Sequence, residues 1–302
     1  MKSHLALFLV SFLYAVLFSW AGQIMPNYLS AEAFVWLRIA FAATLFHLIG
    51  RALSNEKINW KLHWKEFAIC GFFGTSANMY LFFKGLETTY PINGAVLMLF
   101  TPLFVAIFDH IRVKQWPKPI FILAVAIAAT ASVSLMTANG VKFSEKTLRG
   151  DIWIAINAIF YAVYLVRVKK LTAHYKPITI NRYTFTFGLL FITPFGIHEF
   201  IQTDWVNIPT NIGLKIGYIL VFTSFLVYLL NAYAIQHSGP TLAGLYIYLQ
   251  PILASIIAVF LQTDTLTPNK MLYIALVLVS TFAASRFTPK FQSNLNGKSS
   301  TK

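Results

Sequence analysis

The chain has 302 residues, of which 57% are hydrophobic and only 11% are charged, and its formal net charge is +14. A soluble protein of this length carries much more charged surface, so the composition indicates an integral membrane protein. The positive charge does not indicate a nucleic-acid partner, because the basic residues are scattered over short loops between apolar blocks. The single cysteine, Cys70, excludes an intramolecular disulfide.

Ten apolar segments follow one another along the chain, each close to the roughly 20 residues that a helix needs to cross a membrane. They cover residues 5–24, 33–50, 67–86, 91–109, 119–138, 151–168, 178–197, 214–234, 240–261 and 270–287. The short alternating strands of a membrane barrel are absent from the sequence. We therefore predict an all-α integral membrane protein with ten transmembrane helices.

The first segment also has features of a signal peptide. Lys2 precedes the apolar stretch, and the small-x-small triplet Ser19-Trp20-Ala21 resembles a cleavage site. The apolar stretch is longer than an ordinary signal core, and the internal repeat described below needs it as a helix. We interpret it as the first span.

Loop charges predict the orientation of the bundle. With the N-terminus in the cytoplasm, most of the 24 Lys and Arg fall on the cytoplasmic side. The positive-inside rule then predicts that both termini lie in the cytoplasm. We expect a multi-pass protein of the plasma (inner) membrane. Residues 288–302 are polar, and we predict that they form a disordered cytoplasmic tail.

Two stretches of the chain repeat each other. YLFFKGLETTYPINGAVLMLFTP (80–102) and YLLNAYAIQHSGPTLAGLYIYLQP (228–251) both begin Tyr-Leu, and FLYAV (12–16) matches IFYAV (159–163). Residues 1–140 and 150–287 thus form two halves of five spans each. Because five is odd, the second half enters the membrane from the opposite side, which makes an inverted repeat.

This pattern resembles the drug/metabolite transporter superfamily, in particular its EamA-type permeases. The residues that carry the resemblance are GLETTYPINGAVLMLFTPLFVAIF (85–108), AIQHSGPTLAGLYIYLQPILASIIAVF (234–260) and FVWLRIAFAATL (34–45). The resemblance implies a secondary carrier that moves a small metabolite, amino acid-like or drug-like, by alternating access and often as an exporter. It does not specify the substrate.

Two prolines are predicted to kink helices near the membrane midplane. Pro102 and Pro251 each lie eleven residues after a proline that begins their helix, which is about 16 Å of rise. Each proline removes a helical hydrogen bond, and the residue before it is polar, Thr101 or Gln250. We predict that these two polar side chains bind substrate, while a packing kink without ligand contact is the alternative.

Four further residues are candidates for the substrate site. Arg38 lies inside the second span, where it either locks helices together or binds a carboxylate or phosphate of the substrate. Asn78 is a mid-span amide that links helices or donates to substrate. Tyr161 and Tyr246 are predicted to line the cavity, although Tyr246 and Tyr248 point to different sides of their helix.

The sequence contains no positive sign of an enzyme, a cofactor site or a metal site. Nucleotide-binding and hydrolase motifs are absent, and the histidines form no helical pair that suits a metal. All 10 carboxylates lie in loops or at span ends, which disfavours proton coupling through a midplane acid. The expected partners are a small-molecule substrate and the lipid bilayer, and a homodimer is compatible with the sequence. The alternative to a transporter is a membrane-embedded enzyme or scaffold.

Overall fold

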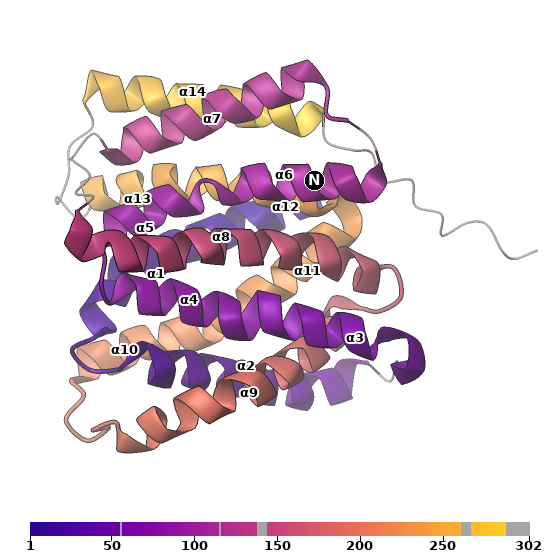
Figure 1. The fold of residues 1–302 in the computed structure, drawn as a ribbon, viewed down its shortest axis with the longest axis vertical. Coiled ribbons are helices and arrows are strands. Elements are labelled where there is room, and N and C mark those ends of the chain that lie inside the picture. The colour runs from indigo at the N-terminus through magenta and orange to yellow at the C-terminus, as the bar shows by residue number, and fades with distance from the viewer. Residues whose placement is uncertain (55, 115, 138–143, 261–266, 288–302) are drawn as a thin grey trace, which may run out of the picture.

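The computed structural model describes residues 1–302 apart from 55, 115, 138–143, 261–266 and 288–302, and its regular elements are all helices (Figure 1). The tail predicted at 288–302 lies outside the described residues. In chain order the elements are α1 (Lys2–Ile24), α2 (Ala31–Leu53), α3 (Trp60–Gly71), η1 (Phe72–Ser76), α4 (Ala77–Leu86), α5 (Pro91–Met98), α6 (Thr101–Val113), α7 (Pro119–Thr137), α8 (Glu145–Thr172), α9 (Pro177–Gln202), α10 (Thr210–Tyr218), η2 (Ile219–Leu226), α11 (Val227–Ser238), α12 (Pro240–Leu245), η3 (Tyr246–Tyr248), α13 (Leu249–Phe260) and α14 (Pro268–Arg286).

These elements join into the ten predicted spans. The third span is α3, η1 and α4, the fourth is α5 and α6, the eighth is α10, η2 and α11, and the ninth is α12, η3 and α13. Within the described ranges, eight stretches are long and apolar enough to cross a membrane, and Pro119–Leu135 is a shorter apolar helix. The prediction of an all-helical membrane protein with ten transmembrane helices is confirmed.

The two halves repeat the same irregularities at matching positions. The third and eighth spans each contain a π-helical segment, η1 and η2, and the fourth and ninth spans are each interrupted before a proline. Helices that correspond in the two halves pack directly against each other, as α2 does with α9 and α7 with α14 (Figure 1). With five spans in each half, the second half runs through the bundle in the opposite sense.

Hydroxyl groups support the two π-helical segments. A π-helix inserts an extra residue and removes carbonyls from the regular hydrogen-bond ladder. In η1 the Thr75 hydroxyl donates to the Gly71 carbonyl at 2.6 Å, and in η2 the Thr223 hydroxyl donates to the Ile219 carbonyl at 2.8 Å. Since no water reaches such groups inside a bilayer, side chains must provide these bonds.

Both predicted proline positions coincide with breaks in their helices. α5 ends at Met98 and α6 begins at Thr101, so the fourth span is interrupted just before Pro102. In the ninth span the 3₁₀ turn η3 precedes Pro251. Because proline lacks the backbone N–H, the preceding turn tightens to i→i+3 bonds, as in the bond from Phe100 N to the Leu97 carbonyl at 3.2 Å.

Small residues let α9 approach the third span very closely. A Cβ added to Gly188 on α9 would collide with the Thr75 hydroxyl, and one added to Gly71 would lie 2.7 Å from the Phe187 Cβ. Such close backbone packing replaces the hydrophobic driving force, which is absent between helices in lipid. Glycine at these positions therefore fixes the crossing of two spans from different halves.

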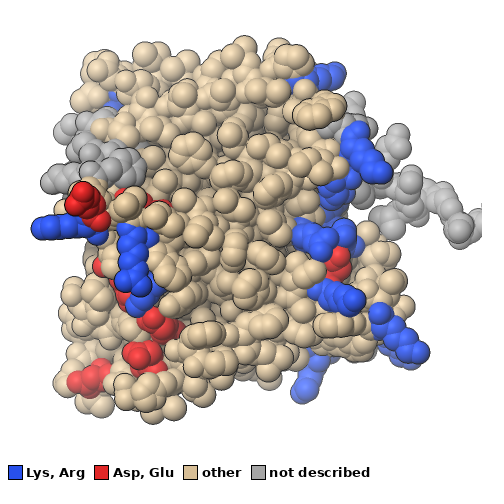
Figure 2. All heavy atoms as spheres, viewed as in Figure 1, with Lys and Arg blue, Asp and Glu red and all other residues tan. Residues whose placement is uncertain are grey.

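Charge is distributed unequally between the two ends of the bundle. The N-terminus and the C-terminal end of α14 lie at the same end (Figure 1). On the face drawn in Figure 2, Lys and Arg gather at that end, and Asp and Glu lie mainly at the opposite end. At the acidic end Lys84 pairs with Glu32 at 3.0 Å and with Glu87 at 2.8 Å.

Candidate functional site

A cavity lies in the centre of the bundle between the two halves. Its volume is about 60 Å³, which is room for on the order of four or five water molecules. Side chains from both halves line it: Tyr14, Leu17, Arg38, Asn78, Met79, Phe82, Phe83, Met98, Asn157, Tyr161, Tyr228, Ile247 and Gln250. The lining therefore combines apolar surface with one cation, three amides and three phenols.

Arg38 extends from α2 into the interior and is only 2% exposed. Its Nε donates to the Ser224 hydroxyl at 2.8 Å, and its Nη2 donates to the Thr223 hydroxyl at 3.3 Å. The guanidinium carbon also lies 4.8 Å from the centre of the Phe83 ring, a cation–π distance. The π-helical segment η2 of the second half thus holds the buried cation of the first half.

The polar neighbours orient Arg38 but do not neutralise it. An arginine at the centre of a membrane helix costs about 2.5–3.5 kcal/mol on insertion scales, and hydroxyls offset part of that cost without removing the charge. Among the described residues, Arg38 Nη1 has no hydrogen-bond partner, and the cavity lining contains neither Asp nor Glu. The cavity therefore carries an uncompensated positive charge.

Two asparagines connect α4 to α8 beside the cavity. The Asn157 side chain donates to the Asn78 carbonyl at 2.5 Å, and the Asn78 side chain donates to the Asn157 carbonyl at 3.5 Å. Within the described part of the chain, the buried Asn157 Oδ1 accepts no hydrogen bond. The pair therefore joins the two halves and also offers an acceptor beside the cavity.

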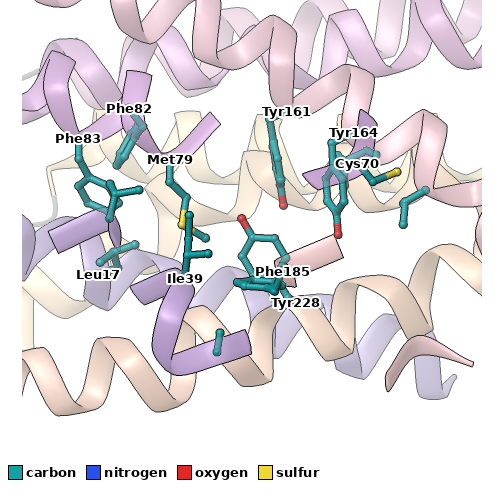
Figure 3. Packing of buried hydrophobic residues seen from close by; sticks show 14 of the residues in the cluster. Leu17, Ile39, Cys70, Met79, Phe82, Phe83, Tyr161, Tyr164, Phe185 and Tyr228 are labelled. Carbon is teal, nitrogen blue, oxygen red and sulfur yellow. The ribbon is translucent and has the colours of Figure 1, made fainter. Parts of the chain in front are cut away.

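Three tyrosines gather at the same level. Figure 3 shows the hydroxyls of Tyr161 and Tyr228 pointing toward one another. Tyr161 accepts a hydrogen bond from Asn231 at 3.0 Å, and Tyr228 donates to the Gly74 carbonyl at 2.8 Å. The third phenol, Tyr14, lines the same cavity. Tyr14 and Tyr161 are matching positions of the repeat, FLYAV and IFYAV.

The structure brings four of the six predicted substrate residues to this cavity: Arg38, Asn78, Tyr161 and Gln250. The half-buried Gln250 amide makes no hydrogen bond to the described residues. Its neighbour Pro251 lines an adjoining cavity of about 40 Å³, which Gln250 shares.

Thr101 and Tyr246 do not line the cavity. Thr101 is fully buried elsewhere, and Met98 is the residue that the fourth span contributes. The Tyr246 hydroxyl instead meets His4 Nδ1 at 2.7 Å. In an uninterrupted α-helix Tyr246 would lie on the same face as Gln250. The 3₁₀ turn at Tyr246–Tyr248 winds more tightly than an α-helix, so the two side chains are expected to lie roughly 100° apart around the helix axis.

Three polar lining residues, Tyr14, Asn157 and Tyr228, were not among the predicted site residues. Tyr14 could have been found as the repeat partner of Tyr161. Tyr228 is the first residue of the second repeated stretch, 228–251, and the repeat by itself does not indicate that this residue lines a cavity. Asn157 is a mid-span amide of the same kind as Asn78, and sequence alone does not separate cavity amides from packing amides.

Buried carboxylates join the two halves near both ends of the bundle, in two contacts that we call the end closures. Asp151 on α8 accepts from Thr89 at 2.5 Å and from Asn93 at 3.3 Å, beside the start of α5. At the other end, Asp109 on α6 accepts from Thr241 at 2.5 Å, beside the start of α12. Each contact joins one half to the other at the N-terminus of an interrupted span. The central cavity lies between these two closures along the bundle.

Comparison with known proteins identifies two copies of one family in this chain. The EamA-like transporter family matches residues 1–137 and again residues 148–286. An uncharacterized transporter of Archaeoglobus fulgidus is 24% identical over 269 residues, which is 86% of this chain and 89% of the relative. The threonine/homoserine exporter RhtA of Escherichia coli K12 is 24% identical over 217 residues, 71% of this chain and 70% of the relative.

A solved crystal structure has the same fold. It superimposes with a TM-score of 0.75 at 15% sequence identity, and the match covers 96% of this chain and 99% of that one. The family match extends over nearly the whole chain, and the family is one of transporters and not of enzymes. This chain is a multi-pass membrane transporter that belongs to the EamA-like transporter family, with one EamA domain in each half.

Proposed function

We propose that this protein is a secondary carrier that exports a small metabolite by alternating access, with the central cavity as its substrate site. The observation that carries the proposal is the cavity itself, which both halves line and which holds Arg38, Asn78, Tyr161 and Gln250. Inverted-repeat carriers place substrate at the midplane between the repeats. The rocking of one half against the other would then expose the cavity to each side in turn.

The two end closures fit this mechanism. Thr89 and Asn93 contact Asp151 at one end, and Thr241 contacts Asp109 at the other. Each closure is a small set of hydrogen bonds between the halves, worth about 0.5–3 kcal/mol per bond, so each can break without unfolding the bundle. The cavity of about 60 Å³ must enlarge to hold a metabolite, which requires such an opening.

The charge distribution supports an orientation with both termini in the cytoplasm of a plasma (inner) membrane. The basic end of the bundle in Figure 2 is the end that carries the N-terminus and the end of α14. By the positive-inside rule this end faces the cytoplasm. A homodimer stays a prediction.

An amino acid-like substrate is the favoured metabolite. The similarity to RhtA, a threonine/homoserine exporter, supports this class and the outward direction. The test is flux in proteoliposomes that contain the purified protein and labelled threonine, homoserine or other amino acids. Saturable exchange that Gln250→Ala reduces supports the proposal, and flux equal to that of protein-free liposomes for every amino acid contradicts the amino acid-like assignment.

A further inference from the structure

The charge of the central cavity restricts the class of molecule that it can carry. Arg38 is the charged residue among the described lining residues, and a guanidinium keeps its proton under all ordinary conditions. The carboxylates of the described ion pairs belong to Glu32, Glu66, Glu87 and Asp109, which lie toward the ends of the bundle. A molecule that enters the cavity therefore meets one fixed positive charge.

The hydrogen bonds of Arg38 leave one edge of the guanidinium available. A guanidinium presents paired N–H groups along two edges, each of which matches a carboxylate. The edge formed by Nε and Nη2 is occupied by Ser224 and Thr223. Along the other edge, Nη1 has no partner within the described ranges. Arg38 can therefore link α2 to η2 and bind a ligand at the same time, because the two contacts use different edges of its guanidinium.

We propose that the substrate is an organic acid whose single carboxylate binds the Nη1 edge of Arg38, an inference that rests on the proposed transport function. A carboxylate carries one negative charge and neutralises one guanidinium. A phosphate monoester carries about −1.5 to −2 at pH 7 and would leave excess negative charge in the cavity. An amine without an acid group would add a second positive charge beside the first.

The rest of the lining describes the remainder of this acid. Met79, Phe82 and Ile247 present apolar surface, which suits a hydrocarbon chain. The unpartnered Asn157 Oδ1 and the Gln250 amide suit a hydroxyl or amino group on the same molecule. The cavity therefore fits a hydroxy acid or amino acid better than a cationic drug or a sugar phosphate.

A matched set of small probes tests the proposed substrate class on the wild-type protein. Butyrate, butyramide and butylamine have nearly the same size and shape but carry a negative, no and a positive charge. In lipid nanodiscs butyrate should raise the Tm, and butyramide, butylamine and methyl phosphate should raise it much less. An equal or larger shift with butyramide or butylamine, or no shift with butyrate, overturns the proposal.

Variants test whether Arg38 is the group responsible. Arg38→Gln should abolish the shift in Tm that butyrate causes. Arg38→Lys keeps the positive charge but lacks the paired N–H groups of the guanidinium edge. It should weaken butyrate binding roughly tenfold, as expected for the loss of one charge-assisted hydrogen bond. The control is Arg182→Gln, since Arg182 lies within a span but bonds to His47 outside the cavity. A butyrate shift that persists in Arg38→Gln, or that the control loses to the same extent, contradicts the assignment.

A second variant covers the case in which Arg38 substitutions do not fold. Gln250→Glu adds a carboxylate to the same lining without breaking a described hydrogen bond. It should abolish butyrate binding, and unchanged butyrate binding would overturn the proposal. Flux of labelled amino acids and hydroxy acids in proteoliposomes separates the two proposals, because butyric acid and butylamine cross a bilayer unaided in their neutral forms. Binding of butylamine in preference to butyrate refutes the substrate class alone, whereas butyrate binding without carrier-dependent flux of any labelled acid refutes transport.

Discussion

Arg38 on α2 and Ser224 on the π-helical segment η2 are joined by a 2.8 Å hydrogen bond between the Nε and the hydroxyl. The bond connects the first half of the repeat to the second at the level of the cavity. The π-helical turn there presents the Thr223 and Ser224 hydroxyls toward the same guanidinium. The first prediction concerns this bond.

Ser224→Ala should destabilise the protein by about 1.5–3 kcal/mol, because it removes a buried hydrogen bond to a charged group. The control is Ser76→Ala, the matching position of η1 in the first half, which is also buried but makes no hydrogen bond to an arginine among the described residues. Thermal unfolding of the two variants in the same detergent measures the difference. Equal losses of stability would show that the Arg38 bond contributes nothing specific.

The close crossing of α9 and the third span predicts a steric effect at Gly188. Gly188→Ala should cost about 1–3 kcal/mol, because the added Cβ collides with the Thr75 hydroxyl. Gly213→Ala is the control, since nothing lies within 4 Å of a Cβ at that position.

Thr75→Ala removes the hydroxyl that collides with the added Cβ. The double variant Gly188→Ala/Thr75→Ala should therefore lose less stability than the sum of the losses in the two single variants. Unfolding temperatures of the four proteins give the coupling directly. Strict additivity would contradict the contact.

The two polar residues of the ninth span should differ in their effect on transport. Gln250→Ala removes an amide from the cavity and should weaken substrate binding roughly 3- to 10-fold, the range for one neutral hydrogen bond. Tyr246→Phe removes a hydroxyl that meets His4 outside the cavity and should leave the concentration for half-maximal flux unchanged. Initial flux rates in proteoliposomes over a range of substrate concentrations distinguish the two. A larger effect of Tyr246→Phe would mean that the substrate path passes on the other side of the ninth span.

The orientation predicts where reporter fusions are active. A reporter inserted in the loop between α9 and α10 (203–209) should read as external, and one fused after residue 302 should read as cytoplasmic. The insertion site lies in an exposed connection, so it should not disturb packing. A cytoplasmic signal from the loop would contradict both the orientation and the inverted arrangement.

The ten spans and the inverted repeat were predictable, because apolar length, loop charge and the matched prolines are local features of the chain. The position of Gln250 was predictable from its depth beside Pro251. The π-helical segments were not, since neither contains a proline and their Thr–Ser pairs, Thr75-Ser76 and Thr223-Ser224, are common in ordinary membrane helices.

Side-chain direction was the harder part of the site. Tyr246 was expected at the cavity, but its direction depends on how tightly the turn before Pro251 winds, and the amino-acid pattern does not specify that winding. Thr101 matches Gln250 in the repeat, yet the fourth span places Met98 at the cavity instead. Depth along a helix follows from residue number, whereas rotation about the axis depends on every irregular turn before it.

Access to position 250 from the two sides of the membrane tests the central claim most directly. The native Cys70 is buried and can be replaced by alanine, which leaves Gln250→Cys as a single reactive thiol. A membrane-impermeant thiol reagent should label this cysteine when applied from either side, and substrate should protect it. Thr101→Cys, at the matching but buried position, should react much more slowly. Labelling of position 250 from neither side, with or without substrate, would contradict an alternating-access cavity at the centre of this bundle.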